Sequence, residues 1–128
     1  MLFRSADMAH AFHPSHQDKH DEANRPVIGK GMVIKENADD RYASSGFSST
    51  IFKTICDALE VPHQDYIARQ DMSCGSTVGP SVAANLGCPT VDVGCAMWGM
   101  HSSAETMGAN DLKYAIRAFR GVLNGEWS

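Results

Sequence analysis

The sequence is 128 residues long and carries 15 acidic side chains against 11 Lys and Arg, which gives a formal net charge of −4 near neutral pH. This length fits one domain, and 43% hydrophobic with 20% charged residues is typical of a folded globular protein. The acidic balance argues against a nucleic-acid partner, because phosphate binding requires a dense basic face, and the sequence lacks the long apolar run of a membrane span. We therefore expect a small-molecule or peptide substrate.

The first half of the sequence predicts a loop, a strand and a helix, after an opening stretch that resembles part of a strand and so suggests a fragment. Polar residues without an apolar period predict a long exposed loop over 14–29. The apolar run 32–34 predicts a short buried strand with Lys35 at its C-terminal end. The spacing of apolar residues predicts a helix over 48–59, and Pro62 follows it as a helix stop.

The second half continues the alternation of strands and helices. Residues 63–70 predict a strand, and 71–87 predict a turn of small residues that leads into a helix closed by Gly87. The β-branched run "PTVDVG" predicts a strand that ends at Gly94. A helix is predicted over 110–123, with Asn110 as its N-cap. Its expected apolar face consists of Leu112, Ala115, Ile116, Phe119, Val122 and Leu123. The order implies an α/β layer fold in which polar residues at strand ends converge on one site.

The four cysteines lack CxxC spacing, and no signal peptide precedes them. They are Cys56, Cys74, Cys88 and Cys95. We interpret them as reduced thiols in a cytoplasmic chain.

Four of the six histidines, His10, His13, His16 and His20, lie within eleven positions. The first three are spaced to line one face of a helix, and zinc sites use such spacings. Pro14 argues against a continuous helix through the cluster. We favour a solvated histidine-rich loop over a self-contained zinc site.

Two further stretches offer candidate ligands. Asp7, at the end of a predicted buried strand, is a better metal-ligand candidate than a residue in a loop, whereas spacing alone leaves His101 as either a ligand or a surface histidine. The backbone N–H groups of "CGSTVGP" are suited to a carboxylate or phosphate, but Gly75 and Gly79 suit tight helix–sheet packing equally well.

Four motifs, taken together, resemble a known family. "SADMAHAFHP", "VIKENADDRYAS", "RQDMSCGSTVGP" and "TVDVGCAMWGMHS" are similar, in order and spacing, to the C-terminal part of the aspartyl aminopeptidases, which are two-zinc exopeptidases. The resemblance covers nearly the whole sequence. It implies a three-layer α/β/α zinc-peptidase-like catalytic domain, of which residues 1–128 are the C-terminal part. The upstream catalytic residues and an inserted oligomerisation domain would then be absent.

The resemblance also implies roles for six residues. Asp7 and His101 match metal-binding positions of the family. His13 matches a histidine that enters a neighbouring subunit's active site, which implies a homo-oligomer. The positions that match substrate-binding residues are His10, Lys35 and Tyr42.

The implied activity is the release of N-terminal Asp or Glu from peptides. Two zinc ions, or other divalent metals, can lower the pKa of a bridging water toward roughly 7 and polarise the scissile carbonyl. Lys35 and His10 are cationic or can become so, which suits recognition of an acidic side chain. The alternative is that Lys35 merely solvates a strand end.

The departures from the family matter equally. Two metals need about six ligands and a general base, yet Asp7 and His101 are the family ligands found here. The remaining histidine, aspartate and glutamate pair lie upstream in the family; Glu105 does not obviously replace them, HExxH is absent, and no catalytic base is assigned. We therefore expect the isolated chain to be inactive. The alternatives are a non-catalytic half-site chain that associates with full-length subunits, or a relative that prefers apolar N-termini.

Two local differences concern the candidate site. His16 stands where the family tends to have an aromatic residue and has no assigned role, while His20 is expected to fix the loop. "GCAMWGMHSS" replaces the family's usual "GIPQLSMHSI", which alters the expected pocket shape beside His101.

Overall fold

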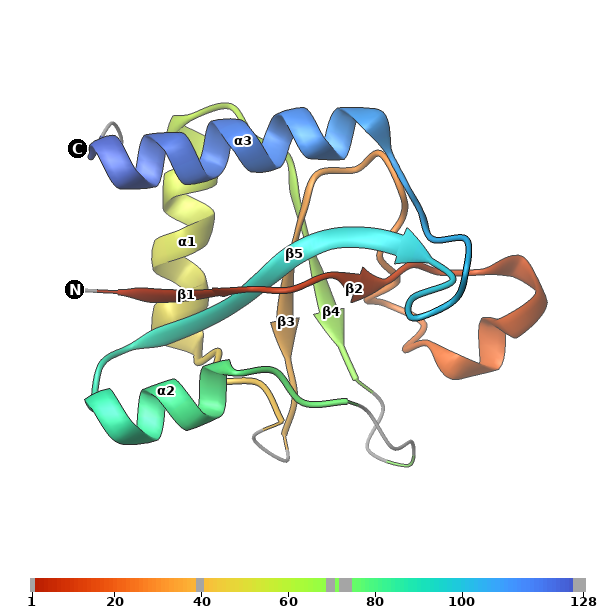
Figure 1. The fold of residues 1–128 in the computed structure, drawn as a ribbon, viewed down its shortest axis with the longest axis horizontal. Helices are drawn as coiled ribbons and strands as arrows, with labels where there is room; N and C mark the ends of the chain where they lie inside the picture. The colour runs from red at the N-terminus through yellow and green to blue at the C-terminus, as the bar shows by residue number, and fades with distance from the viewer. Residues whose placement is uncertain (1, 39–40, 69–70, 72–74, 126–128) are drawn as a thin grey trace.

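A computed structural model describes residues 2–38, 41–68, 71 and 75–125 of the chain (Figure 1). Strands and helices alternate along it, as the sequence predicts. The strands are β1 (Phe3–Ala6), β2 (Ala9–His10), β3 (Met32–Glu36), β4 (His63–Ile67), β5 (Thr90–Trp98) and β6 (Thr106–Met107). The helices are the 3-10 helix η1 (Pro14–Lys19) and the α-helices α1 (Gly46–Ala58), α2 (Gly79–Leu86) and α3 (Ala109–Asn124).

The strands form one mixed sheet with β5 at its centre. The main order is β1-β5-β3-β4, and the short strands β2 and β6 also pair with β5. β1 and β2 run parallel to β5, whereas β3 and β6 run antiparallel to it, and β4 is parallel to β3. Because side chains alternate between the faces of a strand, this register sends alternate residues of β3 and β5 to opposite sides of the sheet.

One face of the sheet carries the main hydrophobic core. Met32 and Ile34 of β3 lie beside Cys95 and Val93 of β5 in the register, and all four are nearly or fully buried. Helices α1 and α3 contact each other and cover this face with the buried side chains Phe52, Ile55, Cys56, Ala118 and Val122. Burial of these apolar surfaces is the main favourable contribution to folding.

The other face carries Val33, Lys35, Asp92 and Ala96, which alternate with the core residues along β3 and β5. Helix α2 begins against this face, because Gly79 lies directly on the Asp92 side chain. In Figure 1, α3 and α2 lie on opposite sides of the sheet. The chain is therefore an α/β fold with the layer order helix, sheet, helix that the resemblance implies.

Strand β5 is longer than its sequence predicts. It continues past Gly94 to Trp98, because residues 95–98 find partners in β2, β3 and β6. Gly94 serves close packing rather than termination: a Cβ there would lie 1.8 Å from the carbonyl oxygen of Asp7. The prediction of a strand end was wrong because strand partners distant in sequence decide where pairing stops.

The predicted loop over 14–29 is partly ordered. Residues 14–19 form η1, in which His16 has non-helical backbone angles, so a continuous helix through the histidine cluster does not form. His20 and Pro26 are buried, while most of the segment is exposed. The expectation of a wholly exposed loop was therefore wrong at these two positions.

Helix α3 forms where predicted, but its buried face differs. Gly108, not Asn110, is the N-cap. Leu112, Ile116 and Leu123 are 54%, 59% and 83% exposed, although they were expected to face the core. Two contacts fix the helix rotation. Asp111 accepts hydrogen bonds from Gly29 and Gly31, and Gly121 packs against the Leu59 side chain.

The remaining helix predictions are confirmed. Ser45 and Ser48 form a capping box at the start of α1, and α2 ends at Gly87 with a left-handed φ of 59°. β4 forms as predicted, while positions 69 and 70 of the predicted strand lie outside the described residues.

Cys56, Cys88 and Cys95 are free thiols, and Cys74 lies outside the described residues. Within the described part of the chain, no helix combines the length and apolar character needed to cross a membrane.

Candidate functional site

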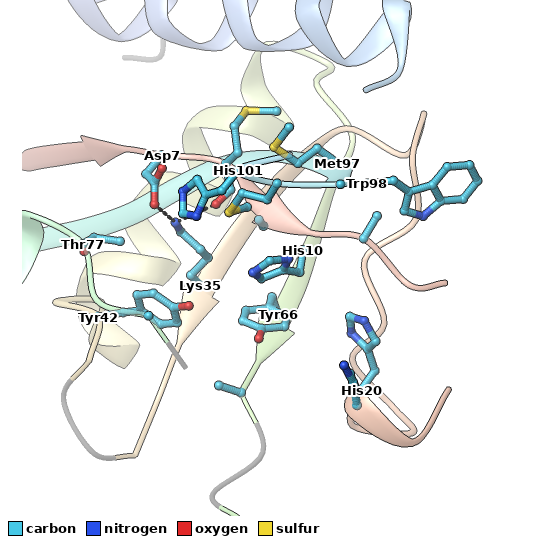
Figure 2. A pocket seen from close by; sticks show the side chains of 18 of the residues that line it. Asp7, His10, His20, Lys35, Tyr42, Tyr66, Thr77, Met97, Trp98 and His101 are labelled. Carbon is cyan, nitrogen blue, oxygen red and sulfur yellow. Dashed lines mark hydrogen bonds and ion pairs between the residues drawn. The ribbon is translucent and has the colours of Figure 1, made fainter. Parts of the chain in front are cut away.

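A cavity of about 940 Å³ opens on the face of the sheet opposite α1 and α3 (Figure 2). Strands β2, β3, β4 and β5 and the loops that follow them contribute to its wall. All six site residues predicted from the sequence line it, although they come from segments up to 94 positions apart: Asp7, His10, His13, Lys35, Tyr42 and His101.

Asp7 lies where strand pairing is interrupted between β1 and β2. The Asp7 N–H donates to the carbonyl of Val93 at 3.0 Å, and the lack of a side chain at Gly94 leaves room for the Asp7 carbonyl. The Asp7 side chain is 54% exposed and turned to the cavity, so one carboxylate oxygen remains accessible to a ligand.

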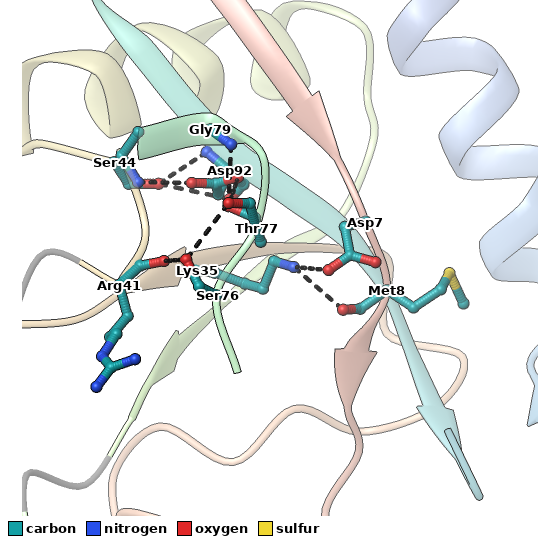
Figure 3. Close-up of polar contacts among 10 residues, drawn as sticks. Asp7, Met8, Lys35, Arg41, Ser44, Ser76, Thr77, Gly79 and Asp92 are labelled. Atoms are coloured by element: carbon teal, nitrogen blue, oxygen red, sulfur yellow. Dashed lines mark hydrogen bonds and ion pairs between the residues drawn. The ribbon is translucent and has the colours of Figure 1, made fainter. Parts of the chain in front are cut away.

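Lys35 is 1% exposed at its side chain, in the floor of the cavity. Its Nζ donates to Asp7 Oδ2 and to the Met8 carbonyl, both at 3.1 Å (Figure 3). The Nζ also lies 5.1 Å from the centre of the Tyr42 ring. The alternative that Lys35 solvates a strand end is wrong, because the side chain is buried. An ammonium carries three protons, so one donor remains beyond these two bonds.

His101 lies in the turn between β5 and β6 and is exposed. Its φ of 67° is left-handed, which is unusual for a residue with a side chain and is often found where function constrains the backbone. The carboxylate of Glu105 accepts a hydrogen bond from the His101 N–H at 2.7 Å and so holds this conformation. In Figure 2 the imidazole of His101 faces the same space as Asp7 and Lys35.

The pKa of His10, in β2, depends on its burial and on these neighbouring groups. Partial burial lowers its pKa below the usual value, and His101 and Lys35 lower the pKa further, while Asp7 acts in the opposite direction. His10 is therefore neutral near pH 7 and can donate or accept one hydrogen bond without carrying charge. The positive charge that would suit an acidic ligand is therefore not expected on His10 near neutral pH.

Two tyrosines form the wall beyond Lys35. Tyr42 is 7% exposed, and its ring meets that of Tyr66 edge to face at 6.3 Å between centroids. Tyr66 was not predicted as a site residue. Its parallel register partner in β3 is Lys35, which places both side chains on the cavity face, so strand alternation was the available signal.

The other histidines have separate surroundings. His13 caps η1 by accepting from the Ser15 N–H at 3.2 Å, and its ring lies edge to face on Trp98 at 5.5 Å. His20 packs between Phe12 and Tyr66, consistent with the expectation that it fixes the loop, and burial lowers its pKa. His16 is exposed at the rim.

Cys74 of the "CGSTVGP" stretch lies outside the described residues, and residues 75–80 pack around Asp92, which was not predicted as a site residue. Asp92 is fully buried, and a Cβ on Gly79 would lie 2.5 Å from its carboxylate. Gly75 has open space around it. At Gly79 the structure therefore favours the packing interpretation over binding of an external anion. An acidic residue inside a β-branched run was the signal that could have identified Asp92.

Asp7 and His101 fit zinc by ligand type, since carboxylate oxygen and imidazole nitrogen are ligands that zinc accepts. Among the described residues, no group of three or more His, Cys, Asp and Glu side chains is placed to hold a metal ion. Asp7 and His101 thus remain two candidate ligands on one cavity wall.

Comparison with known proteins places these features in context. The model of the aminopeptidase I zinc metalloproteases (M18) matches residues 2–122. A Ricinus communis protein described as a probable aspartyl aminopeptidase is 47% identical over 119 residues, which are 93% of this chain and 24% of that protein. A chain in the cryo-EM structure of the Ape4 and Nbr1 complex matches with a TM-score of 0.90 at 39% identity, covering 98% of this chain and 25% of that one.

The S. cerevisiae mApe1 dodecamer shares the fold, with a TM-score of 0.86 at 22% identity over 98% of this chain and 27% of that one. The chain thus spans about a quarter of the length of the proteins that it matches.

Proposed function

Because the chain belongs to the aminopeptidase I zinc metalloprotease (M18) family, we propose that it forms the substrate-binding wall and half of the metal site of an aminopeptidase that releases N-terminal Asp or Glu from peptides. One observation carries this proposal: the buried ammonium of Lys35 lies in the same cavity wall as the two candidate metal ligands, Asp7 and His101. The description of the Ricinus communis relative as an aspartyl aminopeptidase agrees with it.

Asp7 and His101 are the residues that would hold zinc, with two ions in the complete site. When bound, zinc polarises the scissile carbonyl and lowers the pKa of a bound water. Lys35 keeps the Asp7 carboxylate directed into the cavity through the 3.1 Å hydrogen bond. The turn closed by Glu105 fixes the backbone at His101. The Asp7 carboxylate and the His101 backbone are therefore held in place before a metal binds, which lowers the cost of binding it.

The acidic side chain of the substrate would lie against Lys35. The third proton of the Lys35 ammonium can form a charge-assisted hydrogen bond with the substrate carboxylate, and in a buried site such a bond is stronger than in water. The hydroxyl of Tyr42 and the neutral imidazole of His10 supply uncharged hydrogen-bonding groups beside it. A single buried cation favours a substrate with one carboxylate over an apolar one.

Among the described residues we assign no general base to this reaction, because the Glu105 carboxylate is engaged by the backbone of its own turn. Together with the half-site, this predicts negligible hydrolysis by the isolated 128 residues. We propose that the complete enzyme is a cytoplasmic homo-oligomer in which His13 contacts substrate across a subunit boundary. The dodecamer of S. cerevisiae mApe1 supports the oligomeric part of this proposal.

The test has two parts, both with purified chain and added zinc. First, NMR titration with L-aspartate and with L-leucine should shift the amide resonances of β2 and β3 at lower concentration for aspartate. Preference for leucine would instead support an enzyme for apolar N-termini. Second, peptides with N-terminal Asp should remain uncleaved, and robust zinc-dependent turnover would contradict the half-site account.

A second candidate function rests on helix α3. Leu112, Ile116 and Leu123 present an exposed apolar stripe, which is a common feature of protein interaction surfaces. In this candidate the chain is non-catalytic and associates with full-length M18 subunits through this stripe. Co-purification with a full-length subunit that is lost in Ile116→Lys, but kept in Lys113→Glu on the same helix, would favour this candidate.

A further inference from the structure

Asp92 lies in the middle of β5, on the cavity face of the sheet, and is fully buried. Its Oδ2 accepts a hydrogen bond from the N–H of Ala43, and its Oδ1 accepts one from the hydroxyl of Thr77, both at 2.6 Å (Figure 3). One buried carboxylate therefore joins two segments that are separated by more than thirty positions in the sequence. These segments are 41–44, which precedes α1, and 75–79, which leads into α2.

Further contacts reinforce this junction. The N–H of Asp92 donates to the Ser44 hydroxyl at 2.9 Å, and the N–H of Gly79 donates to the Thr77 hydroxyl oxygen at 3.2 Å. Ser76 also links the two segments directly, by donating to the carbonyl of Arg41 at 3.2 Å. Because the carboxylate receives its donors without competing water, its hydrogen bonds should contribute strongly to the geometry.

The start of α2 is shaped to fit Asp92. A Cβ at Gly79 would lie 2.5 and 2.6 Å from the two carboxylate oxygens, which is too close for any side chain. The absence of a side chain at Gly79 thus lets the helix approach the carboxylate.

The two joined segments form one rim of the cavity. Tyr42 precedes Ala43 and lies beside the Lys35 ammonium, while Thr77 faces the cavity from the opposite segment. We propose that Asp92 is a positioning residue. It sets the distance between segments 41–44 and 75–79 and thereby places Tyr42 for recognition of an acidic ligand. The part concerning the ligand rests on the proposed function; the part concerning the rim does not.

The chain contains a matched control. Asp111 is also fully buried and also accepts two hydrogen bonds, in its case both from backbone N–H groups, Gly29 at 2.6 Å and Gly31 at 2.9 Å, but this junction lies outside the cavity wall. Asp92→Asn and Asp111→Asn each replace a buried carboxylate by an amide of the same shape. Comparing them separates a general loss of stability from an effect on the rim.

Residue-resolved amide hydrogen exchange tests the rim directly. In Asp92→Asn the amide of Ala43, which donates to the carboxylate, should exchange roughly tenfold faster, as expected for losing one charge-assisted hydrogen bond, with a shift of the Tyr42 ring resonances. The amide of Gly79 donates to the Thr77 hydroxyl, which Asp92 holds in place, and should also exchange faster. In Asp111→Asn the faster amides should instead be those of Gly29 and Gly31. Asp92→Ala, which removes both acceptors, should show the larger effect; if it does not fold, Asp92→Asn decides.

L-aspartate is the probe for the ligand. Its dissociation constant, from NMR titration, should rise about tenfold in Asp92→Asn and stay unchanged in Asp111→Asn. Unchanged exchange at Ala43 and Gly79, or an equal loss of affinity in both variants, would overturn the role of Asp92. If the wild-type chain fails to bind L-aspartate, the acidic-substrate proposal fails, and the exchange comparison still decides whether Asp92 positions the rim.

Discussion

Replacing Lys35 by methionine tests the acidic selectivity most sharply, because methionine retains most of the side-chain volume and removes the charge. The ammonium is 1% exposed and donates to Asp7 and to the Met8 carbonyl, so the substitution leaves both acceptors without this donor. Asp7 is 54% exposed and water can replace the lost bond there, which limits the expected loss of stability to about 1–2 kcal/mol.

The expected effect on ligand binding is larger and selective. One charge-assisted hydrogen bond contributes about 1.5–3 kcal/mol, so Lys35→Met should raise the dissociation constant of L-aspartate roughly ten- to a hundredfold. L-leucine binding, which needs no cation, should change little. Lys53→Met is the control, because Lys53 forms an ion pair with Asp65 at 2.8 Å and is absent from the cavity wall.

Isothermal titration calorimetry with both amino acids measures these constants, and urea denaturation measures the stability of each variant. Equal loss of aspartate and leucine binding in Lys35→Met would refute the selective role of Lys35. Unchanged aspartate binding in a folded Lys35→Met variant would refute it as well.

Three further predictions concern stability and reactivity. Burial lowers the pKa values of His20 and His10, so the unfolded chain binds more protons in acid, and the free energy of unfolding should fall from about pH 7 to about pH 5. Urea denaturation should show a smaller fall in His20→Phe, whereas an unchanged fall would argue against this origin. Burial raises the pKa of Cys56 to about 12 and that of Cys95 to about 11, so at most two of the four thiols should react rapidly with Ellman's reagent near pH 8. Rapid reaction of three or four thiols in the folded chain would contradict this. A Cβ at Gly94 would meet the Asp7 carbonyl, so Gly94→Ala should destabilise the chain by about 1–3 kcal/mol in urea denaturation. Gly46→Ala, which meets nothing within 4 Å, should cost much less, and equal costs would show that the backbone at Asp7 yields easily.

The local elements were predictable where the sequence pattern is strong. The apolar run at β3 and the helical spacing in α1 identify both elements, because burial on one face leaves a clear period. The end of β5 and the rotation of α3 were not predictable in this way. Trp98 belongs to β5 because it pairs with Thr106, which is distant from the predicted strand end. The rotation of α3 about its axis is set by the buried hydrogen bonds of Asp111, and the spacing of hydrophobic residues does not reveal such a polar contact.

The residues of the candidate site also fall into those that the sequence predicts and those that it does not. Motifs identified Asp7, Lys35 and His101, which the fold brings to one cavity from distant segments. Tyr66 and Asp92 were missed, because their importance depends on sheet register and on which loops meet above β5. The lowered pKa of His10 was not predictable for the same reason: it results first from burial and then from His101 and Lys35, which are distant in sequence.

The central claim is that zinc binds at Asp7 and His101 and not in the histidine cluster that includes His13 and His16. Calorimetric zinc titration of the chain and its variants tests this most directly. Zinc affinity should fall in Asp7→Asn and in His101→Gln and should be unchanged in the double variant His13→Gln/His16→Gln. Loss of zinc binding in the double variant, with Asp7→Asn and His101→Gln unaffected, would contradict the account.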